Sequence, residues 1–288
     1  MSPLEQFLTR AEAVLSRLES LMPPAVEAID WETPSVAYRW RSRNGRGTLR
    51  PLVHSTRISL PDLYFIERQK GLLEQNTRQF IEGKPANNVL LTGARGTGKS
   101  SLIRACLNQF ADKGLRLIEV DRNDLVDLVD IGELIASRPE RFILYCDDLS
   151  FDEGESSYKA LKSALDGSVA AQPDNMLIYA TSNRRHLLPE RMSDNLGYAQ
   201  GKDGDIHPGE TVEEKISFSD RFGLWLSFYP FSQDEYLTIV AHWLRSFGCP
   251  DAQVEDARAE ALQWALHRGS RSGRTAWQFA RDFSGRHL

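Results

Sequence analysis

The sequence predicts an α/β protein built on a five-stranded parallel sheet that helices cover on both faces. From residue 61 onward, short apolar runs alternate with helical patterns. Runs of four to eight apolar residues separated by helices are typical of parallel strands buried on both faces. The runs are NVLL at 88–91, LRLIEV at 115–120, RFILYC at 141–146, MLIYAT at 176–181 and GLWLSFYPF at 223–231.

The helical patterns divide the chain into three predicted regions. Residues 1–60 form an N-terminal partner or docking region, residues 61–231 the α/β core, and residues 232–288 a helical lid. The polar, glycine-bearing segment 193–215 is predicted to be a long mobile loop. Helical periodicity covers 61–83, 124–137, 156–170, 232–247, 254–268 and 274–284.

The N-terminal region combines an amphipathic helix with an arginine run. Helical spacing of apolar residues over 1–22 ends at Pro23 and Pro24 and indicates a docking helix. Two interpretations of YRWRSRNGRGTLR at 38–50 stay open: binding of phosphates and exposed bases, or a solvated, partly strand-like segment whose Trp40 packs on the core. The run holds Tyr38, Trp40, Arg39, Arg41, Arg43, Arg46 and Arg50.

Composition narrows the function classes. The 288 residues carry a net charge of -5, which gives no global attraction to nucleic acid, although a local patch could still bind it. Three cysteines without CxxC spacing argue against a disulfide framework and a zinc site. The sequence contains no apolar run of membrane-spanning length, so we expect no membrane contact and a cytoplasmic protein.

A phosphate-binding motif follows the first apolar run. Residues 93–100 match G-x-x-x-x-G-K-S/T between a predicted strand and the helical pattern SSLIRACLNQF. The glycines allow backbone N–H groups to surround phosphates, Lys99 reaches the β and γ phosphates, and Ser100 ligates Mg²⁺. The predicted nucleotide-binding residues are Gly93, Ala94, Arg95, Gly96, Thr97, Gly98, Lys99, Ser100 and Ser101.

Two further runs end in polar side chains suited to a magnesium nucleotide. RFILYC leads into Asp147, which we assign to the metal, and Asp148, which we assign as the base that polarises attacking water. MLIYAT leads to Asn183, whose amide can hydrogen-bond the γ-phosphate or the water. The alternatives are a helix N-cap for Asp148 and an ordinary turn for Asn183.

The order of these motifs resembles the AAA+ ATPases across residues 61–288. After the phosphate-binding motif come FILYCDD, ATSNRR, Ser219-Asp220-Arg221-Phe222 and Ser272-Gly273-Arg274. The combination of GTGKSS, DDLSF, TSNRRHL, SDRFGL and SGRTAWQF is most similar to a functionally uncharacterised bacterial AAA+ ATP-binding family. The resemblance implies a P-loop NTPase with a five-stranded parallel sheet, a C-terminal helical lid and a small, mainly helical N-terminal extension.

The resemblance also implies residue roles. Asn183 resembles the first nucleotide sensor, Arg274 the second sensor on the lid, and Arg221 the arginine finger that a neighbouring subunit offers. The alternative for Arg221 is a structural ion pair. Ile66, in Ile66-Glu67-Arg68-Gln69, aligns with the segment that packs on adenine.

Absent motifs narrow the kind of AAA+ protein. The stretch 121–140 has no aromatic pore loop, which disfavours protein unfolding, and the guanine-selecting motif Asn/Thr-Lys-x-Asp is missing, which favours ATP. The resemblance is loosely to replication initiators and helicase loaders. We therefore expect a slow Mg²⁺-dependent ATPase that oligomerises with ATP and acts as a switch on a nucleic-acid or protein partner through residues 1–60. The alternative is a non-catalytic ATP-binding adaptor, and a small-molecule kinase is disfavoured.

Overall fold

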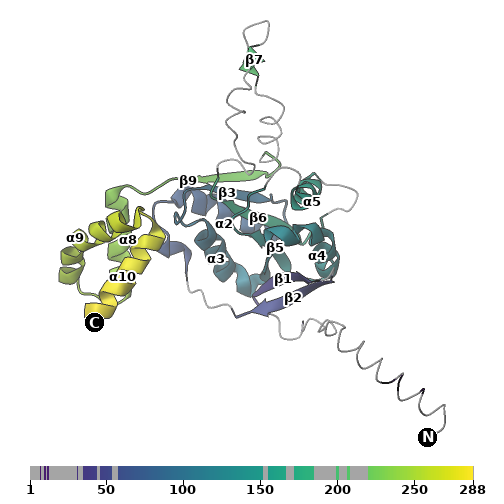
Figure 1. Ribbon diagram of the computed structural model, residues 1–288, viewed down its shortest axis with the longest axis horizontal. Helices are drawn as coiled ribbons and strands as arrows, with labels where there is room; N and C mark the ends of the chain where they lie inside the picture. Colours follow the sequence, from purple (N-terminus) through teal and green to yellow (C-terminus); the bar gives the residue numbers. More distant parts are fainter. Residues whose placement is uncertain are drawn as a thin grey trace. The chain divides into compact units, whose positions relative to one another are not determined.

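The computed structural model divides the chain into two units, Met1–Pro34 and Ser35–Leu288 (Figure 1). It describes residues 35–43, 46–53, 58–151, 155–166, 172–184 and 220–287, with a few isolated positions elsewhere. The predicted helix over 1–22 and the polar segment 193–215 lie almost wholly outside the described residues. None of the described helices is both long and apolar enough to cross a membrane.

A seven-stranded sheet lies at the centre of the second unit, in the order β2-β1-β4-β5-β6-β3-β9. All five predicted strands are present, and each pairs in parallel with its neighbours. They are β3 (Val89–Gly93), β4 (Leu115–Glu119), β5 (Arg141–Cys146), β6 (Met176–Ser182) and β9 (Leu224–Phe228). A separate two-stranded pair joins β7 (Ala199–Gln200) to β8 (Ile206–His207).

The sheet has seven strands where five were predicted, because the N-terminal region contributes two more. β1 (Ala37–Arg43) pairs antiparallel with β2 (Arg46–Leu52) and parallel with β4. The segments 35–43 and 46–53 of the N-terminal region therefore form a β-hairpin at the edge of the sheet, and the predicted helix before them lies almost wholly outside the described residues. The physical reason is the period-two alternation of aromatic and arginine residues in YRWR, which suits a strand with one buried face.

Helices cover both faces of the sheet. α2 (Glu67–Ile81) and α3 (Lys99–Phe110) bury one face in a cluster that includes Leu73, Phe110 and Val89. From β3 the chain crosses the sheet toward β1 to form β4, and from β4 it moves back toward β3 through β5 to β6. Right-handed crossovers therefore place α4 (Leu128–Ile135) and α5 (Ser156–Leu165) on the opposite face from α3. Single turns of 3-10 helix lie at η1 (Leu60–Asp62) and η2 (Ala111–Lys113), and a longer one at η3 (Arg122–Asp127).

Three helices form the predicted lid, with a core of their own. They are α8 (Gln233–Ser246), α9 (Asp251–Arg268) and α10 (Gly273–His287), packed around Tyr236, Ala261 and Phe279. α8 begins at Ser232, whose hydroxyl accepts from the Glu235 N–H at 3.3 Å while the Glu235 carboxylate accepts from the Ser232 N–H at 2.7 Å. This reciprocal cap satisfies two otherwise unpaired donors and fixes where the lid starts.

The strand register brings the predicted site residues to one edge of the sheet. Thr92 at the end of β3 lies opposite Ser182 in β6, and Cys146 at the end of β5 lies opposite Ala180. The residues that follow each strand therefore meet at the carboxyl edge, where ligands bind in open α/β sheets.

Candidate functional site

The loop between β3 and α3 requires its glycines. Gly93, Gly96 and Gly98 have φ values of 131°, 74° and 102°, a region that side chains with a Cβ rarely adopt. A Cβ at Gly93 would lie 1.9 Å from the Phe228 carbonyl oxygen of neighbouring β9. The glycines therefore allow a tight loop of the kind in which backbone N–H groups point toward a phosphate.

Lys99 occupies the interior of this loop. Its side chain is buried, and Nζ donates hydrogen bonds to the carbonyl oxygens of Gly93 and Ala94, both at 2.7 Å, and to Asn183 Oδ1 at 3.1 Å. Burial lowers the pKa of Lys99, and the charges of Asp147 and Asp148 oppose that shift. An ammonium group held in such a loop can donate to the oxygens of a phosphate.

Ser100 and Asp147 meet as a magnesium site requires. Ser100 Oγ donates to Asp147 Oδ1 at 2.9 Å, and Thr181 Oγ1 donates to the same oxygen at 2.5 Å. Desolvation raises the pKa of Asp147, but hydrogen bonds from Thr181 and Ser100 outweigh it, so the pKa is lowered and the carboxylate stays ionised. A hydroxyl and a carboxylate are hard oxygen ligands that fit Mg²⁺, which takes its other ligands from phosphates and water. No cluster of three or more His, Cys, Asp or Glu exists among the described residues.

Asp148 stands beside this pair in an unusual backbone conformation. Its φ of 53° lies in the left-handed region, which Asp tolerates better than most residues. Its N–H donates to Thr181 Oγ1 at 3.0 Å, and its Oδ1 accepts from Asn183 Nδ2 at 2.6 Å. Arg95 Nη2 lies 3.8 Å from the other carboxylate oxygen. The backbone therefore turns Asp148 toward the phosphate-binding loop, which a regular helix N-cap would not require.

The lid contacts the loop directly through the N-terminus of α10. The Gly273 N–H donates to the Gly96 carbonyl at 2.9 Å, and a Cβ at Gly96 would lie 2.6 Å from Ser272 Oγ. Arg274 is exposed and close enough to Lys99 to lower its pKa, a smaller effect than burial. Arg274, the predicted second sensor, therefore lies close to the phosphate-binding loop.

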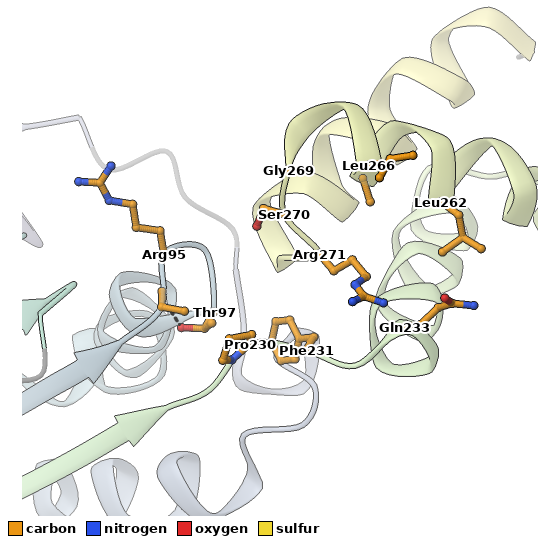
Figure 2. Close-up of a pocket in the computed structure, with 12 residues that line it drawn as sticks. Arg95, Thr97, Pro230, Phe231, Gln233, Leu262, Leu266, Gly269, Ser270 and Arg271 are labelled. Atoms are coloured by element: carbon orange, nitrogen blue, oxygen red, sulfur yellow. Dashed lines mark hydrogen bonds between the residues drawn. The ribbon is translucent and has the colours of Figure 1, made fainter.

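A cavity of about 710 Å³ separates the loop from the rest of the lid, within the size range of ligand pockets (Figure 2). Thr97 forms one wall, Phe231 the floor, and Leu262 and Leu266 of α9 the far wall. In Figure 2 the Arg95 side chain extends away from the lid. The cavity lies beside the Lys99 position and does not contain it.

The predicted adenine contact, Ile66, is buried beside Gly98 of the loop. It lies directly before α2, and its Cδ1 would be 3.5 Å from a Cβ at Gly98. The neighbouring Phe65 has a φ of 61° and packs its ring 6.4 Å from that of Phe231. The structure thus brings Ile66 to the loop, while Ser101 follows Ser100 in the first turn of α3.

Arg221 is the one predicted catalytic residue that does not join the constellation. Its Nε donates to Asp166 Oδ1 at 2.5 Å, just past the end of α5, and 23% of its side chain is exposed. Within this protomer it forms the ion pair that the sequence left open as an alternative.

Two residues at the site, Thr181 and Ser272, have roles that the sequence did not predict. Thr181 is buried and joins the two acids, accepting from the Asp148 N–H while donating to Asp147. Thr181 lies at the carboxyl end of β6, two residues before Asn183, and this position at the ligand-binding edge of the sheet could have identified it. No sequence pattern points to the contact of Ser272 with Gly96.

Replacing Thr181 with valine is expected to weaken the binding of Mg²⁺ that accompanies ATP binding. The isosteric change removes the hydroxyl that donates to Asp147 and accepts from the part-buried Asp148 N–H. We expect about a tenfold rise in the Mg²⁺ concentration needed for half-maximal binding of a fluorescent ATP analogue. Thr181→Ser keeps the hydroxyl and should behave as the parent protein. An unchanged Mg²⁺ requirement in the valine variant would remove Thr181 from the site.

Comparisons with known proteins bear on the fold and on the family. No curated protein matches the sequence. A RuvB variant from Thermotoga maritima has a TM-score of 0.50 and 17% identity, with 78% of this chain and 64% of the RuvB chain covered. AMPPCP-bound DnaA from Aquifex aeolicus has a TM-score of 0.46 and 14% identity, with coverage of 76% and 68%.

The chain spans less than two thirds of the RuvB chain, and at this identity the likeness shows the fold alone. That fold is the AAA+ P-loop NTPase fold. Residues 33–287 match a family described as "Protein of unknown function (DUF815)". Since the match covers most of the sequence, the chain belongs to the DUF815 family.

Proposed function

We propose that the protein binds Mg²⁺-ATP, hydrolyses it slowly at a subunit interface, and uses the nucleotide as a switch. One observation carries the proposal: the Asn183 amide accepts from Lys99 Nζ at 3.1 Å and donates to Asp148 Oδ1 at 2.6 Å. The phosphate-binding lysine and the candidate base are therefore held at one point by the predicted first sensor. A phosphate sensor in contact with both groups suits hydrolysis better than storage of ATP.

Each residue has a distinct task in this proposal. The loop from Gly93 to Ser100 and the Lys99 ammonium bind the phosphates, and Ser100 with Asp147 hold the magnesium ion. The ion neutralises charge that develops on the phosphate oxygens. Asp148 accepts the proton of the attacking water, and Asn183 orients that water.

The structure gives a physical reason to expect slow turnover. Asp148 is one methylene shorter than a glutamate, and its carboxylate is hydrogen-bonded to Asn183 and lies 3.8 Å from Arg95. Before Asp148 can act as a base, one carboxylate oxygen has to leave these partners and reach the water. We therefore expect the rate of hydrolysis to depend on how often the Asn183 and Arg95 side chains release the Asp148 carboxylate.

The proposed switch needs more than one subunit. Arg274 approaches the phosphate-binding loop of its own protomer, whereas Arg221 is held away from it by Asp166. We propose that ATP promotes a homo-oligomer in which Arg221 completes a neighbouring site, in a cytoplasmic protein whose partner, a nucleic acid or a protein, binds through residues 1–60.

Replacing Asp148 with asparagine tests the assignment of the base. Asparagine tolerates the left-handed backbone and can still accept from Asn183, but it cannot take a proton. We expect single-turnover hydrolysis to fall by about 10²–10⁴-fold while the ATP dissociation constant changes less than threefold. Asp112→Asn, a matched change at an exposed acid on η2, is the control.

The same measurement separates the proposed ATPase from the adaptor. In the adaptor, Asp148 is too short to activate water, so the parent protein would release bound ATP unchanged. Parent and Asp148→Asn proteins that both show no hydrolysis in the assembled state would favour the adaptor.

A further inference from the structure

We propose that the arginine face of the β1–β2 hairpin binds the phosphate backbone of a nucleic acid without reading its bases. This inference rests on the proposed function only for the idea that residues 1–60 hold a partner. The arginine face is defined here by Arg39, Arg41, Thr48 and Arg50.

The strand register gathers these residues on one face. Arg39 lies opposite Arg50, and Arg41 lies opposite Thr48. Since side chains alternate along a strand and directly opposed residues share a face, all of them project to the same side of the hairpin. The register continues to the pair Arg43 and Arg46 at the far end. β2 is the edge strand of the sheet, so no further strand flanks it among the described residues.

The aromatic residues of the run lie on the other face and are buried. Trp40 is 3% exposed, and its Nε1 donates to Asp127 Oδ2 of η3 at 2.9 Å. Tyr38 is 1% exposed. A Cβ at Gly47 would lie 1.7 Å from the Trp40 ring, so the chain turns this glycine over the indole. Neither ring can stack on a base, which leaves the phosphates as the groups that this hairpin can recognise.

The charges on the arginine face are only partly balanced. Arg39 forms an ion pair with Glu119 of β4 at 3.0 Å. Arg41 and Arg50 are exposed and make no salt bridge with any described residue. Among the acids of η3, Asp127 accepts from Trp40 on the opposite face, and Asp124 interacts with the backbone of Ser42 and, more weakly, with the charge of Arg41. Two guanidinium groups are thus available to an external anion.

The chemistry of the face favours a nucleic acid over an acidic protein. Guanidinium groups bind phosphate oxygens through paired hydrogen bonds. From Arg39 to Arg50 the face presents guanidinium groups and one hydroxyl but no apolar side chain. Protein interfaces depend on buried apolar or aromatic anchors, which this face lacks. Sequence-independent binding to a polyanion requires only such charges.

The decisive experiment compares the salt dependence of nucleic-acid binding in the parent protein and in three double variants. The full-length protein is titrated against labelled 30-nucleotide DNA and RNA strands and a DNA duplex, with fluorescence anisotropy at several salt concentrations. Arg41 and Arg50, counted together with Arg43 and Arg46 of the same run, give four charges, so the parent is expected to show a slope of log K against log salt near about −3 for single strands. Arg41→Gln/Arg50→Gln should reduce the slope to about −1.5 and weaken binding about 25-fold at 0.1 M salt.

Matched variants keep the result interpretable. Arg245→Gln/Arg258→Gln removes the same charge from exposed positions on the lid and should leave binding unchanged. Arg41→Lys/Arg50→Lys preserves the charge and should restore most of the slope. Oligo-dT and oligo-dA should bind within about threefold of each other because no base is stacked.

Three results would overturn the proposal. They are a parent slope near zero, equal binding by the Arg41→Gln/Arg50→Gln variant and the parent, and binding of polyglutamate in preference to nucleic acid, which would indicate an acidic protein partner. ATP binding measured on the same samples separates this failure from failure of the ATPase proposal, because neither variant touches the phosphate-binding loop.

Discussion

Replacing Lys99 with alanine is expected to abolish ATP binding in practice, with a loss of at least about a hundredfold in affinity. A lysine that reaches the β and γ phosphates makes two charge-assisted hydrogen bonds, each contributing about 1.5–3 kcal/mol. Together they correspond to a factor of about 10² to 10⁴ in the dissociation constant. Calorimetric titration with ATP and Mg²⁺ measures the loss directly.

The control for this variant has to separate binding from folding. Lys99 also donates to the carbonyls of Gly93 and Ala94, so its removal loosens the loop even without nucleotide. Thermal unfolding of the apo variant shows whether the fold survives, and Lys84→Ala, at an exposed lysine paired with Glu82, provides a matched change away from the site. A folded Lys99→Ala protein that binds ATP within threefold of the parent would contradict the phosphate-binding assignment.

The sheet and its active edge could be predicted because their signals are local. Each buried parallel strand is a continuous apolar run, and the observed β5 coincides with the predicted run 141–146. The acids and Asn183 follow such runs directly, so the parallel topology alone brings them to one edge. The contact between Asn183 and Lys99, 84 residues apart, follows from that topology.

The parts that could not be predicted depend on contacts between distant segments. The hairpin β1–β2 joins the sheet through three residue pairs with β4, and no local pattern encodes which sheet edge accepts it. The burial of Trp40 against η3, which agrees with a strand-like segment whose Trp40 packs on the core, also depends on a residue 87 positions away. The contact between Ser272 and Gly96 likewise depends on how the lid is placed, which periodicity does not specify.

Replacing Arg221 with alanine is expected to remove turnover while leaving ATP binding intact. An arginine finger stabilises charge in the transition state and contributes about 10³ to 10⁵ in rate, but it adds little to ground-state affinity. The expected result is a steady-state ATPase rate at least about a thousandfold lower, with a dissociation constant within threefold of the parent. Turnover unaffected by the substitution would exclude the finger role.

The ion pair with Asp166 provides the sharpest test of that role. If Arg221 served only to hold Asp166, then Asp166→Ala would lower turnover as much as Arg221→Ala, because either change breaks the same contact. If Arg221 acts on a neighbouring site, Asp166→Ala removes this one ion pair but keeps the guanidinium, and turnover is retained. The two substitutions remove opposite ends of one partly exposed pair, so their effects on stability should be similarly small. A difference in turnover therefore reports on catalysis.

Mixed assemblies test whether the finger acts on another subunit. Arg221→Ala subunits keep an intact phosphate-binding loop, and Lys99→Ala subunits keep an intact finger. Neither protein should hydrolyse ATP alone, but a mixture places a functional Arg221 beside a functional Lys99 at some interfaces and should recover activity. A finger acting within its own subunit could not be rescued in this way. Recovery on mixing would therefore establish the shared site, and its absence in a mixture shown to co-assemble would place the role of Arg221 within its own subunit.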